Sequence, residues 1–171
     1  MTRVALLSAL VLAAACRDDE SAGGRITVAW TGGDTGRLVV PATARWCAGD
    51  SLMEIIGAAG DSAVAIGILP VDTLSPRTFP VGIPQASRPR PTARVGVRWY
   101  GETLIEGYYG LSGTVTVDSG AGLNGSLEAT LRSVNDGSDI TLSGTFQRIT
   151  IQPGSAQSCG AAVISADSAV R

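Results

Sequence analysis

The chain has 171 residues, of which 13 are arginine, 15 are acidic and none is lysine or histidine, so its formal net charge at pH 7 is -2. A mildly acidic chain with 16% charged residues lacks the basic face that binds nucleic acid, so we expect no nucleic-acid partner. The absence of histidine excludes Ser-His-Asp and Cys-His catalysis and most zinc or copper sites. We therefore expect neither a metal nor a cofactor.

The N-terminus has the features of a secretory leader. The basic residue Arg3 precedes an apolar run from Val4 to Ala15, and charged residues follow from Arg17. At about 1.5 Å per helical residue, this twelve-residue run reaches only about 18 Å, which is short of a hydrocarbon core of about 30 Å. The run is therefore too short to span a membrane, and residues 1–15 are predicted to be a signal peptide.

The small residues directly before Cys16 resemble the lipobox of bacterial lipoproteins, although Ala13 stands where that family usually has leucine. The resemblance implies that the leader is cut before Cys16, that Cys16 carries diacylglycerol and palmitate, and that residues 16–24 tether a domain to the membrane. Arg17 is not the aspartate that retains such proteins at the inner membrane. We therefore expect the cell envelope, at the periplasmic face of the outer membrane or at the cell surface. The alternative is an ordinary signal peptide followed by an incidental cysteine.

The first strands are predicted from alternation. Ile26, Val28 and Trp30 alternate with small or polar residues, and the glycines within 32–36 indicate a hairpin turn. Residues 51–69 contain two continuous apolar runs, whose short length and β-branched residues favour strands on either side of a Gly-Asp turn. A helix within this region, between residues 50 and 60, is the alternative.

Residues 70–91 contain six of the eight prolines in the chain. Proline cannot donate a hydrogen bond to a central strand, so this segment is predicted to be a sheet edge or an ordered loop, with a short edge strand at residues 78–81. A loop of this length either carries a function or simply crosses between sheets.

The next hairpin, over residues 94–109, carries a cluster of aromatic residues. Neighbouring residues of a strand face opposite ways, so one member of each adjacent aromatic pair is expected on the outer face. Such rings beside an arginine would suit stacking on a sugar or contact with a partner protein, whereas cross-strand aromatic pairs also simply stabilise sheets. The candidate ligand-binding residues are Arg98, Trp99, Tyr100, Tyr108 and Tyr109.

One phrase then occurs three times, as Leu-Ser-Gly-Thr-Val at 111–115, Leu-Asn-Gly-Ser-Leu at 123–127 and Leu-Ser-Gly-Thr-Phe at 142–146. Its alternation and the turn-prone residues between the copies predict a three-stranded meander. Ile149 and Ile151 have the opposite parity to the preceding apolar residues, so a β-bulge near Gln147–Arg148 is predicted to return both to the core.

About ten strand candidates and no convincing helix predict an all-β fold, an antiparallel β-sandwich or partly closed barrel of about 8–10 short strands. The predicted domain spans residues 25–159, and residues 160–171 are expected to form a flexible tail. The pattern resembles the small β-rich envelope lipoproteins of unknown function, in which a lipobox precedes one domain with strands of the form Gly-Thr-Val and Gly-Thr-Phe. The resemblance implies no catalytic residues.

Cys47 and Cys159 are predicted to form a disulfide, because a lipidated Cys16 would leave them as the pair in an oxidising compartment. They lie 112 positions apart, and in the chain-entropy model such a bridge contributes roughly 4 to 5 kcal/mol. Two unpaired buried thiols are the alternative.

The expected function is that of a non-enzymatic binding or interaction module, anchored to the membrane by its lipid, with a glycan or an envelope protein as ligand. The second hypothesis is a structural or assembly accessory lipoprotein with no small-molecule site. A carboxylate-based hydrolase is the third, although Glu102 and Glu106 would lie about 13 Å apart on an extended strand, too far for a glycosidase pair. The run Asn135–Asp139 is rich in oxygen ligands but lacks the spacing of an EF-hand, and it is interpreted as a hairpin turn.

Overall fold

The computed structural model describes residues 23–33, 35–83, 90–100, 104–155 and 159. The predicted signal peptide, the predicted lipid attachment site at Cys16 and the predicted tail from residue 160 lie outside the described residues. None of the described residues belongs to a helix long and apolar enough to cross a membrane.

The described residues form ten β-strands. In chain order these are β1 (Arg25–Gly32), β2 (Gly36–Cys47), β3 (Leu52–Ala59), β4 (Ser62–Leu69), β5 (Arg77–Pro80), β6 (Thr92–Tyr100), β7 (Ile105–Asp118), β8 (Leu123–Ser133), β9 (Asp139–Ile149) and β10 (Ile151–Pro153). Residues 51–69 thus form two strands joined by a tight turn, as predicted, and not a helix. The predicted edge strand near residues 78–81 is present as β5.

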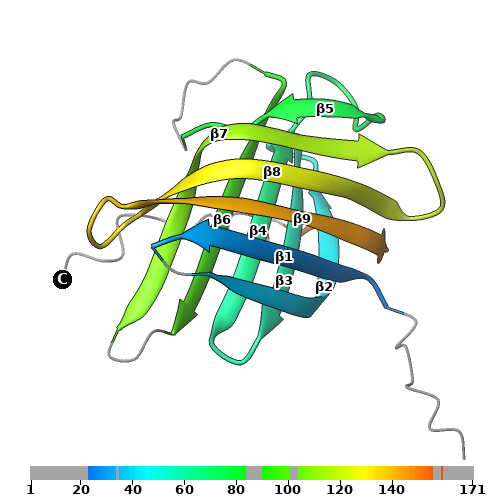
Figure 1. Ribbon diagram of the computed structural model, residues 1–171. Helices are drawn as coiled ribbons and strands as arrows, with labels where there is room; N and C mark the ends of the chain where they lie inside the picture. The colour runs from blue at the N-terminus through cyan, green and yellow to red at the C-terminus, as the bar shows by residue number, and fades with distance from the viewer. Residues whose placement is uncertain (1–22, 34, 84–89, 101–103, 156–158, 160–171) are drawn as a thin grey trace, which may run out of the picture.

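Eight of the strands close into an antiparallel barrel in the order β1-β9-β8-β7-β6-β4-β3-β2, because β1 pairs with both β9 and β2. The other two strands lie against this barrel, β5 antiparallel to β7 and β10 parallel to β2. In Figure 1, strands β7, β8, β9 and β1 form the near wall and cross β6, β4 and β3 behind them at a steep angle. The all-β antiparallel prediction is confirmed, and the architecture is a barrel.

Apolar side chains of alternating residues fill the interior of the barrel. Each wall strand directs every second residue inward, and these residues come from β1, β2, β3, β4, β6, β7, β8 and β9, with Phe79 of β5 closing one side. Fully buried members include Ile26, Val28, Ile55, Ile66, Ile68, Val97, Val115, Leu127, Leu131, Leu142 and Phe146. Side chains therefore occupy the interior, as in other barrels of about eight strands.

The glycine of each repeated phrase marks a close approach between neighbouring strands. A Cβ atom on Gly113 would lie 2.1 Å from the carbonyl oxygen of Glu128, and one on Gly125 would lie 2.0 Å from that of Thr116. A Cβ atom on Gly144 would lie 2.3 Å from the carbonyl oxygen of Thr27. The repeat therefore places glycine where adjacent strands of the meander come too close for any side chain.

The predicted β-bulge is present, but it returns only one isoleucine to the core. The pairing of β8 with β9 shifts register opposite Arg148, whose φ is 54° and whose N–H donates to Asn124 Oδ1 at 2.8 Å. Ile149 is fully buried, as predicted. The prediction for Ile151 is wrong: this side chain is 42% exposed, because β10 leaves β9 and runs parallel to β2.

The predicted disulfide between Cys47 and Cys159 is present, with a Cα–Cα distance of 5.8 Å. It joins the end of β2 to the segment that follows β10. We call the end of the barrel where β1 begins and Cys47 lies the N-terminal end. The opposite end, where β6 meets β7 and β8 meets β9, is called the hairpin end (Figure 1).

Candidate functional site

Two of the predicted binding residues turn into the barrel and pack against a third ring. Trp99 stacks on Trp30 of β1, with ring centroids 4.3 Å apart and planes at 15°. Tyr108 stacks on the other side of Trp99, with centroids 5.0 Å apart and planes at 17°. This column of three rings lies at the hairpin end of the barrel, and Trp30 was predicted from the sequence only as part of an alternating strand and not as a partner of these rings.

The column serves packing more than ligand contact. Trp30 and Tyr108 are only 8% and 7% exposed, so neither offers an open ring face to a sugar. A Cβ atom on Gly36 would lie 2.2 Å from the Trp30 ring, so the ring lies flat against the backbone of β2. Within the described part of the chain, the buried N–H of Trp30 has no acceptor.

The other predicted residues lie on the outer face, as the alternation requires. Tyr100 is 58% exposed, while Tyr109 is half-buried and pairs in register with Arg132. Arg98 is exposed opposite Gly107. The structure therefore divides the predicted aromatic cluster into an inner pair, an outer pair and one outer cation.

Exposed apolar residues lie on the β6–β7 and β8–β9 hairpins at the hairpin end, and we call them the hairpin patch. It consists of Tyr100, Leu104, Ile105 and Val134, which are four of the eight large hydrophobic residues exposed in the described part of the chain. Tyr100 pairs in register with Ile105 across the β6–β7 hairpin. Large apolar residues gathered on one exposed surface are typical of interaction sites.

Hydrogen bonds join the two hairpins that form the patch. The N–H of Val134 donates to the carbonyl oxygen of Gly107 at 2.8 Å, and Asn135 Nδ2 donates to that of Ile105 at 2.9 Å. A Cβ atom on Gly107 would lie 3.2 Å from Val134 Cγ2, so the absence of a side chain at Gly107 leaves room for the side chain of Val134. The patch is thus preorganised. Its signal in the sequence was the presence of apolar residues at turns, where polar residues are the rule.

The acidic residues of the turn beside the patch make their hydrogen bonds within the β8–β9 hairpin, which agrees with the interpretation of residues 135–139 as a hairpin turn. The N–H and the hydroxyl of Ser138 donate to Asp136 Oδ1 at 3.0 and 2.8 Å, which holds the pKa of Asp136 below its usual value. Arg132 donates to both oxygens of Asp139 at 2.8 and 3.1 Å and lowers the pKa of that carboxyl group. No group of three or more potential metal ligands occurs among the described residues.

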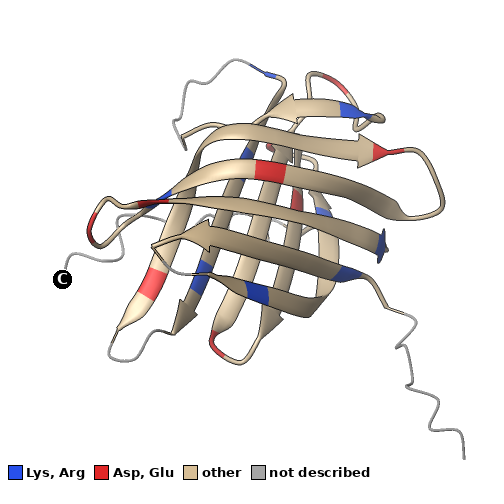
Figure 2. Ribbon diagram, viewed as in Figure 1, with Lys and Arg blue, Asp and Glu red and all other residues tan. Residues whose placement is uncertain are grey.

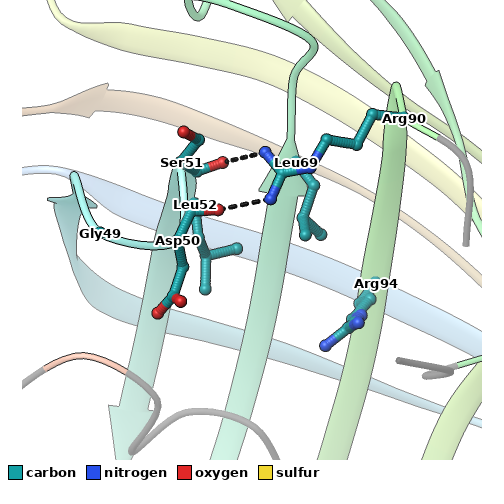
Figure 3. Close-up of a pocket in the computed structure, with 7 residues that line it drawn as sticks. All are labelled: Gly49, Asp50, Ser51, Leu52, Leu69, Arg90 and Arg94. Atoms are coloured by element: carbon teal, nitrogen blue, oxygen red, sulfur yellow. Dashed lines mark hydrogen bonds between the residues drawn. The ribbon is translucent and has the colours of Figure 1, made fainter. Parts of the chain in front are cut away.

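A pocket of about 400 Å³ lies on the outer wall at the N-terminal end of the barrel, where the β2–β3 turn, the end of β4 and the start of β6 meet (Figure 3). We call it the arginine pocket. It is lined by Gly49, Asp50, Ser51, Leu52, Leu69, Arg90 and Arg94. None of these residues was singled out as a binding residue from the sequence, since they come from three separate stretches of the chain, at 49–52, 69 and 90–94, and form no motif.

A buried ion pair lies on the wall beside this pocket. Glu54 is 2% exposed although it belongs to the outward-facing residues of β3, and its Oε2 lies 3.2 Å from Arg45 Nε of β2. In register, Glu54 is opposite both Arg45 and Gly67, and Gly67 is opposite Arg94. Among the strands drawn in Figure 2, acidic and basic residues are scattered, and neither sign dominates.

Comparisons with protein-family models, with curated proteins and with solved structures find no match to this chain.

Proposed function

We propose that this protein is a lipid-anchored protein of the cell envelope that acts as a non-enzymatic binding module, with the hairpin patch as its recognition surface for a protein partner. The observation that carries the proposal is the gathering of Tyr100, Leu104, Ile105 and Val134 on two hydrogen-bonded hairpins. A rigid apolar surface binds with little loss of conformational entropy. Arg98 and the Arg132–Asp139 pair lie on neighbouring outer positions and would supply a polar rim.

The position of the patch agrees with an N-terminal anchor. The chain enters the barrel at Arg25, and β1 then runs for about 25 Å, at about 3.3 Å per residue, towards the hairpin end. A lipid on Cys16 would hold the N-terminal end near the membrane. The hairpin patch would then face away from the bilayer, where a partner can reach it (Figure 1).

A protein partner is favoured over a glycan by the chemistry of the patch. Sugar rings stack on exposed aromatic faces, but Trp99 and Tyr108 use their faces in the inner column. Tyr100 is then the one aromatic member of the patch, and its other three members are aliphatic. Aliphatic side chains around a tyrosine suit the apolar centre of a protein–protein interface.

Photo-cross-linking of the full chain in the envelope tests this proposal. A photoreactive amino acid at Leu104 or Val134 should yield a defined cross-linked partner, whereas the same group at Val39, equally exposed on β2, should not. The Ile105→Ser variant should reduce cross-linking from position 134. Equal products from positions 39, 104 and 134 would contradict the proposal. No product from any of them, together with a melting-temperature rise with glycans that Tyr100→Ala abolishes, would favour a glycan ligand.

The anchor is tested separately by labelling with a fatty acid. The wild-type protein should incorporate the label, and a Cys16→Ala variant should not. Incorporation by that variant would reject lipidation at Cys16 but would leave the hairpin patch as a binding surface.

A further inference from the structure

The arginine pocket has the volume of a small-molecule site. Its volume of about 400 Å³ lies within the range of about 300–1,000 Å³ found for ligand pockets. Leu52 of β3 and Leu69 of β4 give it an apolar wall. A Cβ atom on Gly67 would make ordinary van der Waals contacts with Leu52 Cδ1 at 3.4 Å and with Arg94 Cβ at 3.9 Å, so Gly67 leaves room for a methyl group between these two lining side chains.

The guanidinium group of Arg90 is held in place by backbone oxygens. Its Nη1 donates to the carbonyl oxygens of Ser51 at 3.0 Å and Pro70 at 3.2 Å, and its Nη2 donates to that of Asp50. Figure 3 shows the two carbonyl groups of the β2–β3 turn meeting the Nη1–Nη2 end of the group. Arg90 is therefore fixed by three hydrogen bonds from elements far apart in the chain.

This arrangement leaves one edge of the guanidinium group available. Arginine has five N–H donors, and these contacts use both hydrogens of Nη1 and one of Nη2. The remaining donors, Nε–H and the second hydrogen of Nη2, lie on the same edge of the plane. Two parallel donors on one edge match the two oxygens of a carboxylate or phosphate group. Because Arg90 is already ordered, binding an anion there costs little side-chain entropy.

The charges around the pocket support an anionic ligand of modest size. Arg94 approaches from β6 on one side, and Asp50 lies on the side of the β2–β3 turn (Figure 3). The lining contains two arginines and one carboxylate, a composition that favours a ligand with one anionic group over a ligand with several. The carboxylate of Asp50 also gives an acceptor for a hydroxyl or ammonium group on the same ligand.

We propose that the arginine pocket binds a small organic oxyanion. Its carboxylate or phosphate group is held by the free edge of Arg90 and by the charge of Arg94, and its apolar part lies against Leu52 and Leu69. This site is independent of the hairpin patch, because it lies at the opposite end of the barrel. The protein would thus carry a small-molecule site on its membrane-proximal wall.

Titration calorimetry on the processed full chain tests the proposal with three probes, which are butyrate, inorganic phosphate and butylamine. Butyrate should bind with a Kd of about 1 mM or tighter, and butylamine, of similar length but opposite charge, should not bind. Binding by butyrate alone assigns a carboxylate ligand. Binding by phosphate alone assigns a phosphate ligand, and mutual competition assigns a site for either group.

Variants locate the site. Arg90→Gln and Arg94→Gln should each weaken binding about tenfold or more, because each removes charge-assisted contacts to the anion. Gly67→Leu should place a large side chain against Leu52 and Arg94, two lining residues, and so narrow the pocket, which keeps the test valid if Arg90→Gln does not fold. Arg37→Gln, an exposed arginine at the other end of β2, is the matched control and should bind like the wild type. The proposal is overturned if neither anion binds, if butylamine binds equally well, or if Arg94→Gln and Gly67→Leu bind like the wild type.

Discussion

Replacing Gly125 with alanine should destabilise the barrel, because this glycine lies where three strands meet most closely. Its Cβ atom would lie 2.0 Å from the carbonyl oxygen of Thr116 on β7 and 2.4 Å from Phe146 Cζ on β9. Gly125 pairs in register with Val117 of β7 on one side and with Phe146 of β9 on the other, so β7 contributes a backbone oxygen to the contact and β9 contributes a side chain. Neither neighbour can move without shifting a paired strand.

The magnitude follows from the displacement that the methyl group requires. Cβ contacts below 3.0 Å essentially do not occur, so the Thr116 oxygen must retreat by about 1 Å while the fully buried Phe146 ring also moves. Overpacking of this kind usually costs 1–3 kcal/mol, and a contact with backbone as well as a ring places Gly125→Ala at about 3 kcal/mol. For a chain of roughly this size, that free energy corresponds to a fall in Tm of about 6–12 °C.

Thermal unfolding followed by circular dichroism measures this effect, with Gly33→Ala as the matched control. A Cβ atom on Gly33 would meet nothing within 4 Å, so this variant should unfold within about 2 °C of the wild type or slightly above it. Gly144→Ala should resemble Gly125→Ala, because its Cβ would also meet a backbone oxygen. If Gly125→Ala and Gly33→Ala unfold at the same temperature, the close approach of the strands is refuted as the reason for the repeated glycine.

Three further predictions concern bonds on the outer wall and in the β8–β9 turn. Cys159→Ser should lower the free energy of unfolding by about 4–5 kcal/mol in the chain-entropy model, because the bridge closes 112 positions; denaturant curves that match the oxidised wild type would refute this. Arg45→Met leaves the buried carboxylate of Glu54 without this partner, so it should be more destabilising than the double variant Arg45→Met/Glu54→Leu. Additive effects in that double-mutant cycle would show that the pair is uncoupled. Asp136 has a lowered pKa in the fold, so its charge stabilises the protein above the unfolded pKa of about 3.9, and this contribution is lost as the pH falls through the folded pKa. The Tm of Asp136→Ala should therefore lie below that of the wild type at pH 6, and this difference should shrink as the pH falls through the folded pKa; a difference that stays constant as the solution is acidified would contradict the linkage.

Local sequence patterns were sufficient to predict the strands. Alternation with a period of two requires only that one face of each strand be buried, and that condition is the same in a sandwich and in a barrel. The meander of β7, β8 and β9, the edge strand β5 and the bulge at Arg148 could all be identified for this reason. The bulge between Gly110 and Ser112 of β7 could not be identified in the same way. Leu111 has the same parity as the apolar residues that follow it in β7, so the alternation shows no break at this bulge.

Long-range pairing decided what alternation could not. The barrel closes because β1 pairs with both β9 and β2, and no residue within β1 indicates that it has these two partners. The same closure turns Trp99 and Tyr108 into a column with Trp30, which comes from a strand about 70 residues earlier in the chain. Ile151 faces outward for a related reason, because β10 pairs with β2.

The strand pattern, the disulfide pair and the opposite orientation of adjacent aromatic residues in the hairpin could be predicted without the fold, because they depend on neighbouring residues or on the cysteine count. The fold was needed to show which faces are inner and outer, how Leu104, Ile105 and Val134 join Tyr100 on two neighbouring hairpins, and how Arg90 meets the β2–β3 turn to line a pocket. These surfaces consist of residues from separate strands and turns. Their proximity is fixed by the order and register in which the strands pair, and not by any segment alone.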